Sequence, residues 1–546
     1  MDFEERSYRR ILILFGLICL CLLWFGIQLV RIQLFNYGRF SQAAVSQRSG
    51  LLQTNPLRGL FYDRNGLILR GMGLKRYLLI EQKYPEGKEK RLAAILGQRF
   101  AQAAANHFKD TIWLYSVPLS PPQLRAISQL AMPGLQIVTN PAERDPSQNL
   151  AWHLIGTVSN NRGVFGLESL YNEVLTKNSS SSSLVFLHDG LRRLLHGAGI
   201  RQQKIFGQTG VILTLDRRIQ QIVEKTLDNE RFSGAVVVLD VQNGQILAMA
   251  SRPLVNTHDM AKSLSDPELP FLNRGISAYH PGSLFKLVLV SAGLDTGQLS
   301  LTGKFTDTGN YQIEDHSWSC TTSNGKGHGS IDLQDALAYS CNPVFIEVAL
   351  RLKPQVILKY SDRFGLGKPS NIGFKEEAFG TLPSGVAMTP GEQANMALGQ
   401  QDVLATPLQI ASLIQTIAND GVRNVPRLVL GTTDPERTTI HWLDPEPPLQ
   451  VLKPETAYQV QQMMKAVIDY GTGKEAQIKG GAAGKTGTAQ TGAGNSTPDN
   501  AWFGGYAPFH QPKYVMVVFC EKGISGGKTA APIFREIMDK VTKIKD

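Results

Sequence analysis

The sequence predicts an α+β protein in which helices cover both faces of an antiparallel sheet, preceded by one membrane-spanning helix. Residues 11–30 form an apolar run without charge, which is long enough to cross a bilayer as a helix. Further along, the strand-like runs 236–239 and 246–249 flank Asn243-Gly244, a strong signal for a β-hairpin. With 546 residues, the chain exceeds the size at which one core stops growing, so we expect two or more folded domains.

Other elements follow from apolar runs and their flanking turn residues. Besides the hairpin, we expect strands at 485–489, 501–507 and 514–519. Helices are predicted at 219–228, 283–294, 407–419 and 532–544. A serine run at 179–183 is typical of an exposed flexible loop.

We predict four segments along the chain. Residues 1–10 form a short cytoplasmic tail and residues 11–30 a transmembrane anchor, which stays uncleaved because no small-residue cleavage site follows the apolar run. Residues 31–205 form a pedestal domain of short strands and helices, and residues 206–546 form the catalytic domain. Arginines lie on both sides of the apolar run, so charge alone does not set its orientation.

Composition narrows the classes of function. Lys and Arg number 56 against 46 Asp and Glu, and this diffuse charge of +10 contains no basic block, so we expect no nucleic-acid binding. No His-Glu-x-x-His or Cys-x-x-Cys spacing and no phosphate-binding glycine motif is present. We therefore expect neither a metal nor a cofactor.

The first candidate catalytic motif is Ser283-Leu284-Phe285-Lys286. Residues three apart lie on one helix face, and the run that follows is apolar on every side, as in a buried helix. Burial lowers the pKa of a lysine, and a neutral amine can take the proton of a nearby serine hydroxyl. The alternative is a lysine that reaches solvent along the helix. Ser-x-x-Lys also occurs at Ser323 and Ser525, in Gly-rich stretches that predict loops.

Two further motifs follow in order. Ser340-Cys341-Asn342 comes after a helix-like stretch and is closed by Pro343, which favours an outward-facing turn. Lys485-Thr486-Gly487-Thr488 follows a run of small residues, which indicates a strand approached closely by another backbone or a ligand. Alone, the first fits a plain turn and the second a Gly-rich connection. Together with Ser283 and Lys286, they match the Ser-x-x-Lys, Ser-Asp-Asn and Lys-Thr-Gly set.

On these motifs, the chain resembles the class B penicillin-binding proteins, the monofunctional D,D-transpeptidases that cross-link peptidoglycan. The resemblance covers nearly the whole chain. It includes eight further landmarks in order: Arg58-Gly59, Asp63-Arg64-Asn65-Gly66, His153-Leu154-Ile155-Gly156, Gly166-Leu167-Glu168, Leu213-Thr214-Leu215-Asp216, Asn273-Arg274, Thr406-Pro407-Leu408-Gln409 and the segment 501–508. It implies a penicillin-binding/β-lactamase-like transpeptidase domain on the pedestal.

The resemblance also implies roles. Ser283 is the acyl-forming nucleophile, Lys286 its base, and Ser340 and Asn342 assist proton transfer and hold the peptide. Lys485, Thr486, Gly487 and Thr488 position the donor peptide or a β-lactam carboxylate, and the backbone N–H groups of Ser283 and Thr488 form the oxyanion hole. Expected partners are peptidoglycan stem peptides, β-lactam antibiotics, the lipid bilayer and a membrane glycosyltransferase. The substrate places the catalytic body outside the cell membrane.

Two residues depart from the family pattern, Leu284 after the nucleophile and Cys341 in place of Asp. Cys341 and Cys320 would lie outside the membrane, where disulfides persist, so a redox-sensitive pair beside the active site is one hypothesis. Some sporulation-linked class B proteins look similar here, so a spore-wall role stays open beside elongation and division. Cys520, at the end of a strand-like run, is expected to be an inert buried thiol.

Two other functions use or tolerate the same residues. A D,D-carboxypeptidase or β-lactamase would pass the acyl group to water, because acceptor choice depends on water access and not on the motifs. A β-lactam sensor or scaffold would acylate with little turnover. The predicted anchor and pedestal favour the transpeptidase, and the intact motif set argues against a scaffold.

Overall fold

The computed structural model describes residues 3–38, 40, 49–56, 58–70, 72–81, 88–107, 112–130, 132, 134–143, 150–159, 161–177, 181–187, 201–202, 209–230, 232–257, 259–384, 388–434, 438–490 and 499–544. Contacts divide the chain into two compact units. The first comprises residues 1–57, 74–142 and 180–206, and the second comprises residues 58–73, 143–179 and 207–546. The boundary between pedestal and catalytic domain at residue 206 stays a prediction.

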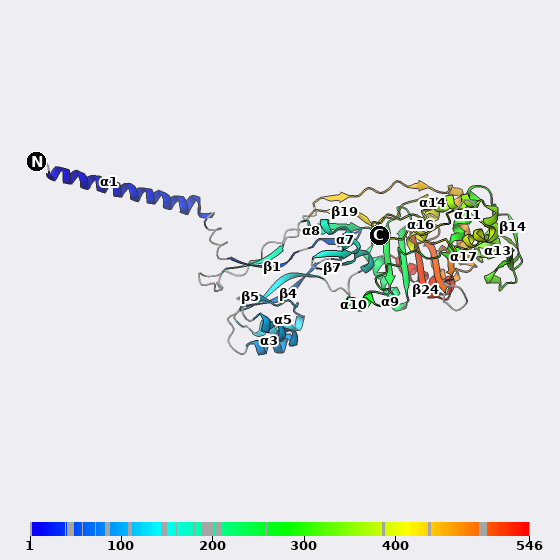
Figure 1. The fold of residues 1–546 in the computed structure, drawn as a ribbon, viewed down its shortest axis with the longest axis horizontal. Coiled ribbons are helices and arrows are strands. Elements are labelled where there is room, and N and C mark those ends of the chain that lie inside the picture. Colours follow the sequence, from blue (N-terminus) through cyan, green and yellow to red (C-terminus); the bar gives the residue numbers. More distant parts are fainter. Residues whose placement is uncertain are drawn as a thin grey trace. The chain divides into compact units, whose positions relative to one another are not determined.

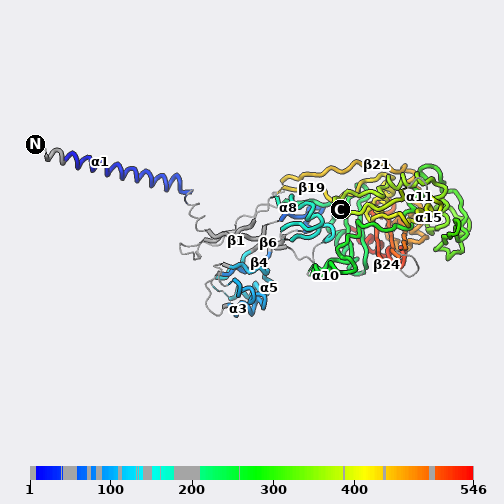
Figure 2. The backbone as a smooth tube through the Cα atoms, viewed as in Figure 1, coloured from blue at the N-terminus to red at the C-terminus, as the bar shows by residue number. Residues whose placement is uncertain are grey.

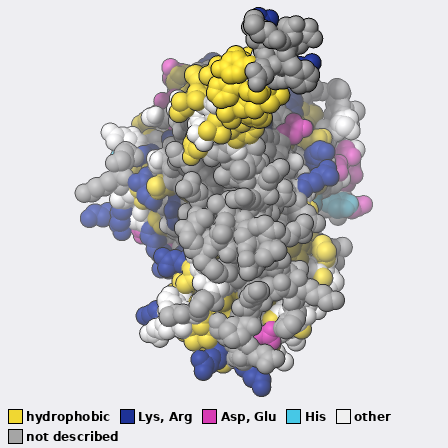
Figure 3. Space-filling model, turned by 90° about the vertical axis from the view of Figure 1, so that its left-hand side faces the viewer, with side chains coloured by type: hydrophobic (Ala, Val, Ile, Leu, Met, Phe, Trp, Pro, Cys, Tyr) yellow, Lys and Arg dark blue, Asp and Glu magenta, His cyan; other side chains and the backbone are white. Residues whose placement is uncertain are grey.

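The chain begins with one long apolar helix. Helix α1 (Phe3–Val30) continues into the π-helical turn η1 (Arg31–Phe35), and Tyr8–Phe35 is the one stretch among the described residues long and apolar enough to cross a membrane. Its mean hydropathy is 2.6 and none of it is buried. In Figure 3, hydrophobic side chains gather in one group over this helix. By length and composition, this helix near the N-terminus indicates a single-pass membrane protein.

Besides α1 and η1, the described residues of the first unit form two small sheets and three helices. In one sheet, β9 (Ser181–Leu187) pairs with β1 (Ser49–Pro56) and β10 (Arg201–Gln202). In the other, β4 (Met72–Glu81) lies between β5 (Ile112–Leu114) and β6 (Leu135–Glu143). The helices are α3 (Lys88–Leu96), α4 (Gln98–Asn106) and α5 (Pro121–Leu130). The expected serine loop is therefore partly wrong, because residues 181–183 begin β9; residues 179 and 180 lie outside the described residues.

The second unit is built on a five-stranded antiparallel sheet. Its order is β13 (Ile246–Arg252), β12 (Gly234–Asp240), β24 (Tyr514–Gly523), β23 (Asp499–Ala507) and β22 (Ala483–Ala489). Strands from early and late parts of the chain thus lie side by side, as the green and orange-red segments of Figures 1 and 2 show. The hairpin predicted at Asn243-Gly244 is confirmed, and Gly244 has a φ of 68°.

Helices cover both faces of this sheet, because alternate strand residues point to opposite sides. Val236 and Val238 belong to a core that includes α9 (Arg217–Glu230) and α18 (Ala531–Val541). Val237 and Leu239 belong to a second core that includes α11 (Lys286–Asp295), α16 (Pro407–Ala418) and α17 (Pro454–Asp469). The predicted architecture and the strands and helices expected in residues 206–546 are confirmed, with ends shifted by a few residues.

The remaining elements connect or flank this framework. A second five-stranded sheet has the order β20 (Ile440–Trp442), β19 (Val429–Thr433), β11 (Gly210–Leu213), β2 (Leu60–Tyr62) and β3 (Ile68–Arg70). Smaller strand pairs are β7 (Thr157–Ser159) with β8 (Arg162–Phe165), β14 (Lys304–Asp307) with β17 (Gly329–Asp332), β15 (Asn310–Ile313) with β16 (His316–Ser319), and β18 (Val422–Arg423) with β21 (Leu449–Gln450). The other helical elements are α6 (Trp152–Ile155), α7 (Gly166–Leu170), α8 (Asn172–Thr176), α10 (Met260–Leu264), η3 (Gly282–Phe285), η4 (Thr321–Ser323), α12 (Leu333–Ala338), α13 (Asn342–Arg351), α14 (Pro354–Arg363), α15 (Pro390–Ala397), η5 (Lys474–Ala476) and η6 (Gly526–Ala530).

Several landmarks noted in the sequence are structural contacts. Arg58 Nε donates to Glu168 Oε2 at 2.5 Å, and the same guanidinium donates to the Glu168 carbonyl at 2.7 Å. Both side chains are about 95% buried, with exposures of 6% and 5%. Arg274, in the landmark Asn273-Arg274, also forms an ion pair, since its Nε donates to Glu521 Oε2 at 2.8 Å. Thr406 and Gln409 form the capping box of α16.

The Arg58–Glu168 pair yields a stability prediction. Glu168→Ala leaves a buried guanidinium without its carboxylate, so it should lower the free energy of unfolding by about 3–5 kcal/mol. Asp362→Ala is the matched control, because it breaks the exposed Lys368–Asp362 pair, which contributes ~0–1 kcal/mol. Chemical denaturation of the full chain in detergent measures both. Equal effects of the two substitutions would contradict this account of the buried pair.

Candidate active site

Ser283 lies on the 3₁₀ turn η3, immediately before helix α11, which begins at Lys286. Side chains at i and i+3 eclipse in a 3₁₀ helix, so the predicted same-face relation of Ser283 and Lys286 holds although Ser283 precedes the α-helix. Ser283 is partly exposed, whereas every residue from Leu284 to Val290 is fully buried. The turn thus presents the hydroxyl while α11 fixes the lysine.

The amine of Lys286 is buried and points at the second motif. Its side chain has 0% exposure, which excludes a lysine that reaches solvent. Nζ donates to the Ser340 carbonyl at 2.8 Å, to Asn342 Oδ1 at 2.7 Å and to Ser340 Oγ at 3.3 Å. Burial lowers the pKa of Lys286 to about 7, against a smaller raising effect of Cys341 and Cys320. Near neutral pH, therefore, a substantial fraction of this amine is uncharged.

One part of the expected geometry differs. We expected the Lys286 amine to contact the Ser283 hydroxyl, but throughout the described part of the chain that hydroxyl makes no hydrogen bond. The amine is held by Ser340 and Asn342 instead. Catalytic hydrogen bonds are commonly long without substrate and tighten in the complex. Because Ser283 and Lys286 are eclipsed, a small movement of the Lys286 side chain would bring its amine to the Ser283 hydroxyl.

Lys485 supplies a second buried amine. It has 0% exposure, and Nζ donates to Ser340 Oγ at 2.9 Å and to the Thr486 carbonyl at 2.9 Å. Burial, with the neighbouring Lys286, keeps the pKa of Lys485 well below its usual range. The Ser340 oxygen thus lies between two amines that resist being charged together.

The second motif is placed differently from the expected outward turn. Ser340 has a φ of 56°, Cys341 is the N-cap residue of α13, and Asn342 begins that helix with Pro343 in its first turn. We read Pro343 as closing a turn, but proline is also favoured in the first turn of a helix, where no N–H is needed. Both the Ser340 and the Asn342 side chain turn inward to Lys286.

The third motif lies on β22, the edge strand of the main sheet, and glycines bring it against the Ser283 turn. A Cβ on Gly282, whose φ is 57°, would lie 2.5 Å from the Thr488 carbonyl oxygen, and one on Gly487 would lie 2.8 Å from the Pro281 carbonyl oxygen. The close backbone approach predicted from the small residues is confirmed. The Leu284 side chain also fits at this contact, because it packs against Gly487 and Gly504, which have no Cβ.

Thr486 and Thr488 line this edge. The Thr486 and Thr472 hydroxyls are 2.7 Å apart, and the exposed Thr488 accepts a hydrogen bond from the Gly526 N–H at 3.3 Å. Thr472 was not identified from the sequence, because a hydroxyl across a turn carries no spacing signal. The strand therefore presents hydroxyl groups beside the two amines.

The alternative Ser-x-x-Lys sequences are not on the turn that carries Ser283, although the second of them packs against β22 through Gly526. Ser323 ends η4 and accepts from the Gly327 N–H, and Ser525 caps η6, so the latter stretch is a short π-helix and not the expected loop. His280 Nδ1 lies 2.9 Å from the Val403 carbonyl oxygen. Cys520 is buried, and burial raises its pKa, as expected of an inert thiol.

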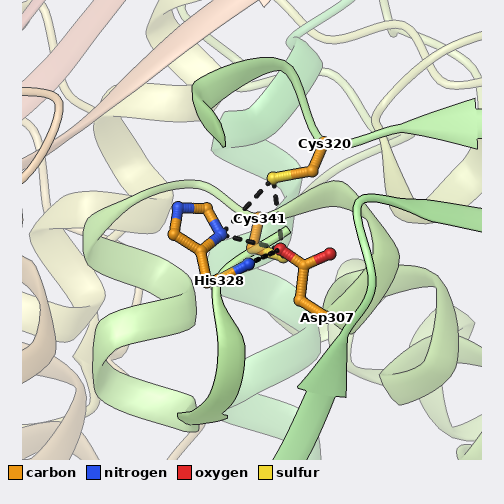
Figure 4. Close-up of side chains that lie close together, drawn as sticks. All are labelled: Asp307, Cys320, His328 and Cys341. Atoms are coloured by element: carbon orange, nitrogen blue, oxygen red, sulfur yellow. Dashed lines mark hydrogen bonds and ion pairs between the residues drawn. The ribbon is translucent and has the colours of Figure 1, made fainter. Parts of the chain in front are cut away.

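The structure brings together a group of side chains that the sequence did not reveal. Asp307, Cys320, His328 and Cys341 converge below the second motif, with one ligand atom of each within 4.8 Å of the others (Figure 4). Cys320 and Cys341 are free thiols with their sulfurs 4.0 Å apart. The sequence did not reveal this group because its four side chains come from separate segments, so no short motif records them. The expectation that no metal is bound stays a prediction. The redox pairing of the two cysteines stays a prediction.

The close approach at Gly282 yields a testable effect. Gly282→Ala introduces both a positive-φ strain and a contact with the Thr488 carbonyl. Gly297→Ala is the control, because Gly297 has a φ of 73° but nothing within 4 Å of its Cβ. We expect Gly297→Ala to cost ~1–2 kcal/mol of unfolding free energy and Gly282→Ala about 1–3 kcal/mol more. Equal losses in denaturant titrations would show that the backbones are not in tight contact.

Comparison with known proteins shows which protein family the chain resembles in sequence. The penicillin binding protein transpeptidase domain, as a sequence family, matches residues 234–539. Stage V sporulation protein D of Bacillus subtilis is 28% identical over 550 residues, covering 96% of this chain and 84% of that protein. The peptidoglycan D,D-transpeptidase PbpA of Mycolicibacterium smegmatis is 34% identical over 327 residues, or 55% of this chain and 65% of its own length.

Full-length similarity extends to other relatives and to the fold. The peptidoglycan D,D-transpeptidase MrdA of Acinetobacter baumannii is 25% identical, covering 98% of this chain and 88% of that protein. The crystal structure of the D,D-transpeptidase domain of a peptidoglycan glycosyltransferase from Eggerthella lenta superposes with a TM-score of 0.65 at 23% identity, over 90% of this chain and 99% of that one. The chain thus belongs to the penicillin-binding protein transpeptidase family, within which it is a class B penicillin-binding protein.

Proposed function

We propose that this protein, a serine D,D-transpeptidase of peptidoglycan, acts through a Ser283 acyl-enzyme whose proton transfers are carried by Lys286 and Ser340. The observation that supports this most strongly is the Lys286 amine, which is buried, has its pKa lowered to about 7 and is held by Ser340 and Asn342. A neutral amine at this position can accept a proton, whereas an ordinary lysine at pH 7 cannot.

In the acylation step, the Ser283 oxygen attacks the carbonyl carbon of the D-Ala-D-Ala peptide bond of a stem peptide. Its proton passes to the Lys286 amine, and the carbonyl oxygen becomes an oxyanion. The backbone N–H groups of Ser283 and Thr488 receive that oxyanion, each worth about 3–4 kcal/mol in such sites. The contact of Gly282 with the Thr488 backbone supports this pairing, because it keeps the two segments adjacent.

Ser340 returns the proton to the leaving group. A hydroxyl has two acceptor lone pairs and one donor, and Ser340 Oγ already accepts from Lys286 and from Lys485. Its own O–H is therefore directed away from both amines and can be given to the departing D-alanine nitrogen, while the Lys286 ammonium passes the proton taken from Ser283 to Ser340 Oγ and is neutral again. The C–N bond breaks, D-alanine leaves, and an ester between Ser283 and the shortened peptide remains.

The donor peptide lies along the edge of β22. This strand has a partner on one side only within the described sheet, so an extended peptide can be aligned beside it. Lys485, Thr486, Gly487 and Thr488 then border its terminal carboxylate, and Asn342 borders the peptide from α13. A β-lactam carboxylate takes the same place, and its ring carbonyl acylates Ser283.

The acyl group passes to an amine of a neighbouring stem peptide, which restores the Ser283 hydroxyl and forms the cross-link. This acceptor lies outside the cell membrane, so α1 anchors the protein with residues 1–10 inside and the catalytic unit outside. The glycan strands being cross-linked come from a membrane glycosyltransferase acting as partner. Muropeptide analysis of such a coupled reaction distinguishes cross-linking from hydrolysis.

The lowered pKa of Lys286 predicts a pH profile. Because the neutral amine is the reactive form, the second-order rate of β-lactam acylation should rise about tenfold per pH unit below about 7 and level off above it. Stopped-flow acylation of the full chain in detergent measures this. Lys286→Arg, which stays charged, should show no such rise. A wild-type rate that stays constant down to pH ~5 would contradict the role of Lys286 as base.

The nucleophile is tested by labelling membranes with a fluorescent penicillin. Ser283→Ala should reduce labelling of the chain to background, because the remaining hydroxyl beside the two amines, that of Ser340, accepts from both and serves proton transfer in this proposal. Ser525→Ala is the matched control, since Ser525 also precedes a lysine by three residues but caps η6, and it should label like the wild type. Label that persists in Ser283→Ala and maps to another residue would overturn the assignment.

A further inference from the structure

Thr472 lies beside the catalytic motifs but belongs to none of them. Its hydroxyl oxygen is 2.7 Å from that of Thr486, a distance typical of an O–H···O hydrogen bond. Thr486 is 6% exposed, and Thr472 is partly exposed. The distance fits either hydroxyl as the donor, so the other neighbours of the two oxygens decide the direction of this hydrogen bond.

Backbone contacts hold Thr472 in place from two sides. Its N–H donates to the Ala338 carbonyl at 3.0 Å, which joins it to the segment that carries Ser340 two residues later. Its carbonyl oxygen packs against Gly527, where a Cβ would lie only 2.5 Å away. The Thr472 hydroxyl therefore reaches Thr486 from a fixed position, between the second motif and the turn η6.

The Lys485 amine has few hydrogens left for a ligand. Burial, with the neighbouring Lys286, lowers the pKa of Lys485 and so favours its neutral form. A neutral amine carries two N–H bonds, which match its two acceptors at 2.9 Å, Ser340 Oγ and the Thr486 carbonyl. Its contact with Thr486 Oγ1 is longer, at 3.5 Å. A carboxylate at the edge of β22 therefore depends on hydroxyl donors as well.

Two hydroxyls on β22 can supply these donors. They belong to Thr486 and Thr488, which lie on one face of the strand because residues two apart point the same way. Thr488 Oγ1 accepts from the Gly526 N–H at 3.3 Å, and its own proton stays free for a ligand. Thr486 has the same arrangement if Thr472 is the donor, because Thr486 then accepts from within the protein and keeps its own proton.

We propose that Thr472 is a positioning residue that selects substrates with a free terminal carboxylate. It donates its hydroxyl proton to Thr486 Oγ1, so the Thr486 O–H is directed at the unpaired edge of β22 and donates to that carboxylate. No covalent bond forms or breaks at Thr472, which acts on the substrate through Thr486. This inference rests on the proposed function, in which the donor peptide or a β-lactam lies along β22.

The charge of the ligand favours this direction of donation. A carboxylate only accepts hydrogen bonds, so a Thr486 proton given to Thr472 would leave lone pairs of Thr486 facing an anion. In the proposed direction, Thr472 donates to Thr486 and Thr486 donates to the carboxylate. A hydrogen bond to a charged acceptor is stronger than one between neutral groups, and successive hydrogen bonds in one direction polarise each other.

The inference is tested with benzylpenicillin and its methyl ester, which differ only in the charge of the carboxyl group. Stopped-flow acylation of the full chain in detergent gives a second-order rate constant for each, and the acid-to-ester ratio measures the contribution of the carboxylate. Thr472→Val removes the hydroxyl and should lower this ratio about tenfold, because part of a hydrogen bond to a charged group is lost. Thr472→Ser keeps the hydroxyl and should retain the wild-type ratio.

Thr416→Val is the matched control. Thr416 is a fully buried threonine of α16, and its hydroxyl donates to the Ser412 carbonyl at 2.9 Å. Its substitution should lower thermal stability and leave the acid-to-ester ratio unchanged. The ratio also separates positioning from a merely structural role of Thr472, because a general disturbance of the site slows acylation by the acid and by the ester alike.

Two results would overturn this inference. One is a folded Thr472→Val protein whose acid-to-ester ratio equals that of the wild type. The other is a ratio that rises in Thr472→Val, since Thr486 would then be the donor in the wild type and would be released by the substitution. In both cases the wild type still forms its penicillin adduct on Ser283, so the proposed function stands. A wild type without that adduct would instead contradict the proposed function itself.

Discussion

The structure depends on one buried amine. Lys286 Nζ lies within a helix that is apolar on every side, and its hydrogen-bond partners are the Ser340 backbone and side chain and Asn342. Burial disfavours its charge and lowers its pKa to about 7, and the same burial requires that polar groups be brought to it. Ser340 therefore adopts a positive φ and Asn342 begins a helix, and these two features give the active site its shape.

The edge strand completes the site by close backbone approach. Gly282 and Gly487 allow the Ser283 turn and β22 to meet where any side chain would separate them. Lys485 and Lys286 both donate to the Ser340 hydroxyl, so three motifs from distant parts of the chain meet at one oxygen. The cluster that includes Cys341 adds a fourth connection, from the segment 304–332 to the helix that carries Asn342.

Several elements of the fold and several side chains of the candidate site were predictable from the sequence. The Asn243-Gly244 hairpin and the helix after Ser283 follow from turn chemistry and apolar patterning. The motif order predicts that side chains of the three motifs meet at one site, as they do. The inward position of Asn342 was missed because Pro343 fits both a turn and a helix start. The group of Asp307, Cys320, His328 and Cys341 was missed because its ligands converge only in the folded chain.

The most direct test of the central claim is a crystal structure of the protein acylated by a β-lactam above pH 7. We predict a covalent bond from Ser283 Oγ to the opened ring, with Lys286 Nζ moved from its present acceptors to within hydrogen-bond distance of Ser283 Oγ. An adduct on another residue would contradict the account. So would a Lys286 amine that still contacts only Ser340 and Asn342 and has no route to the serine oxygen.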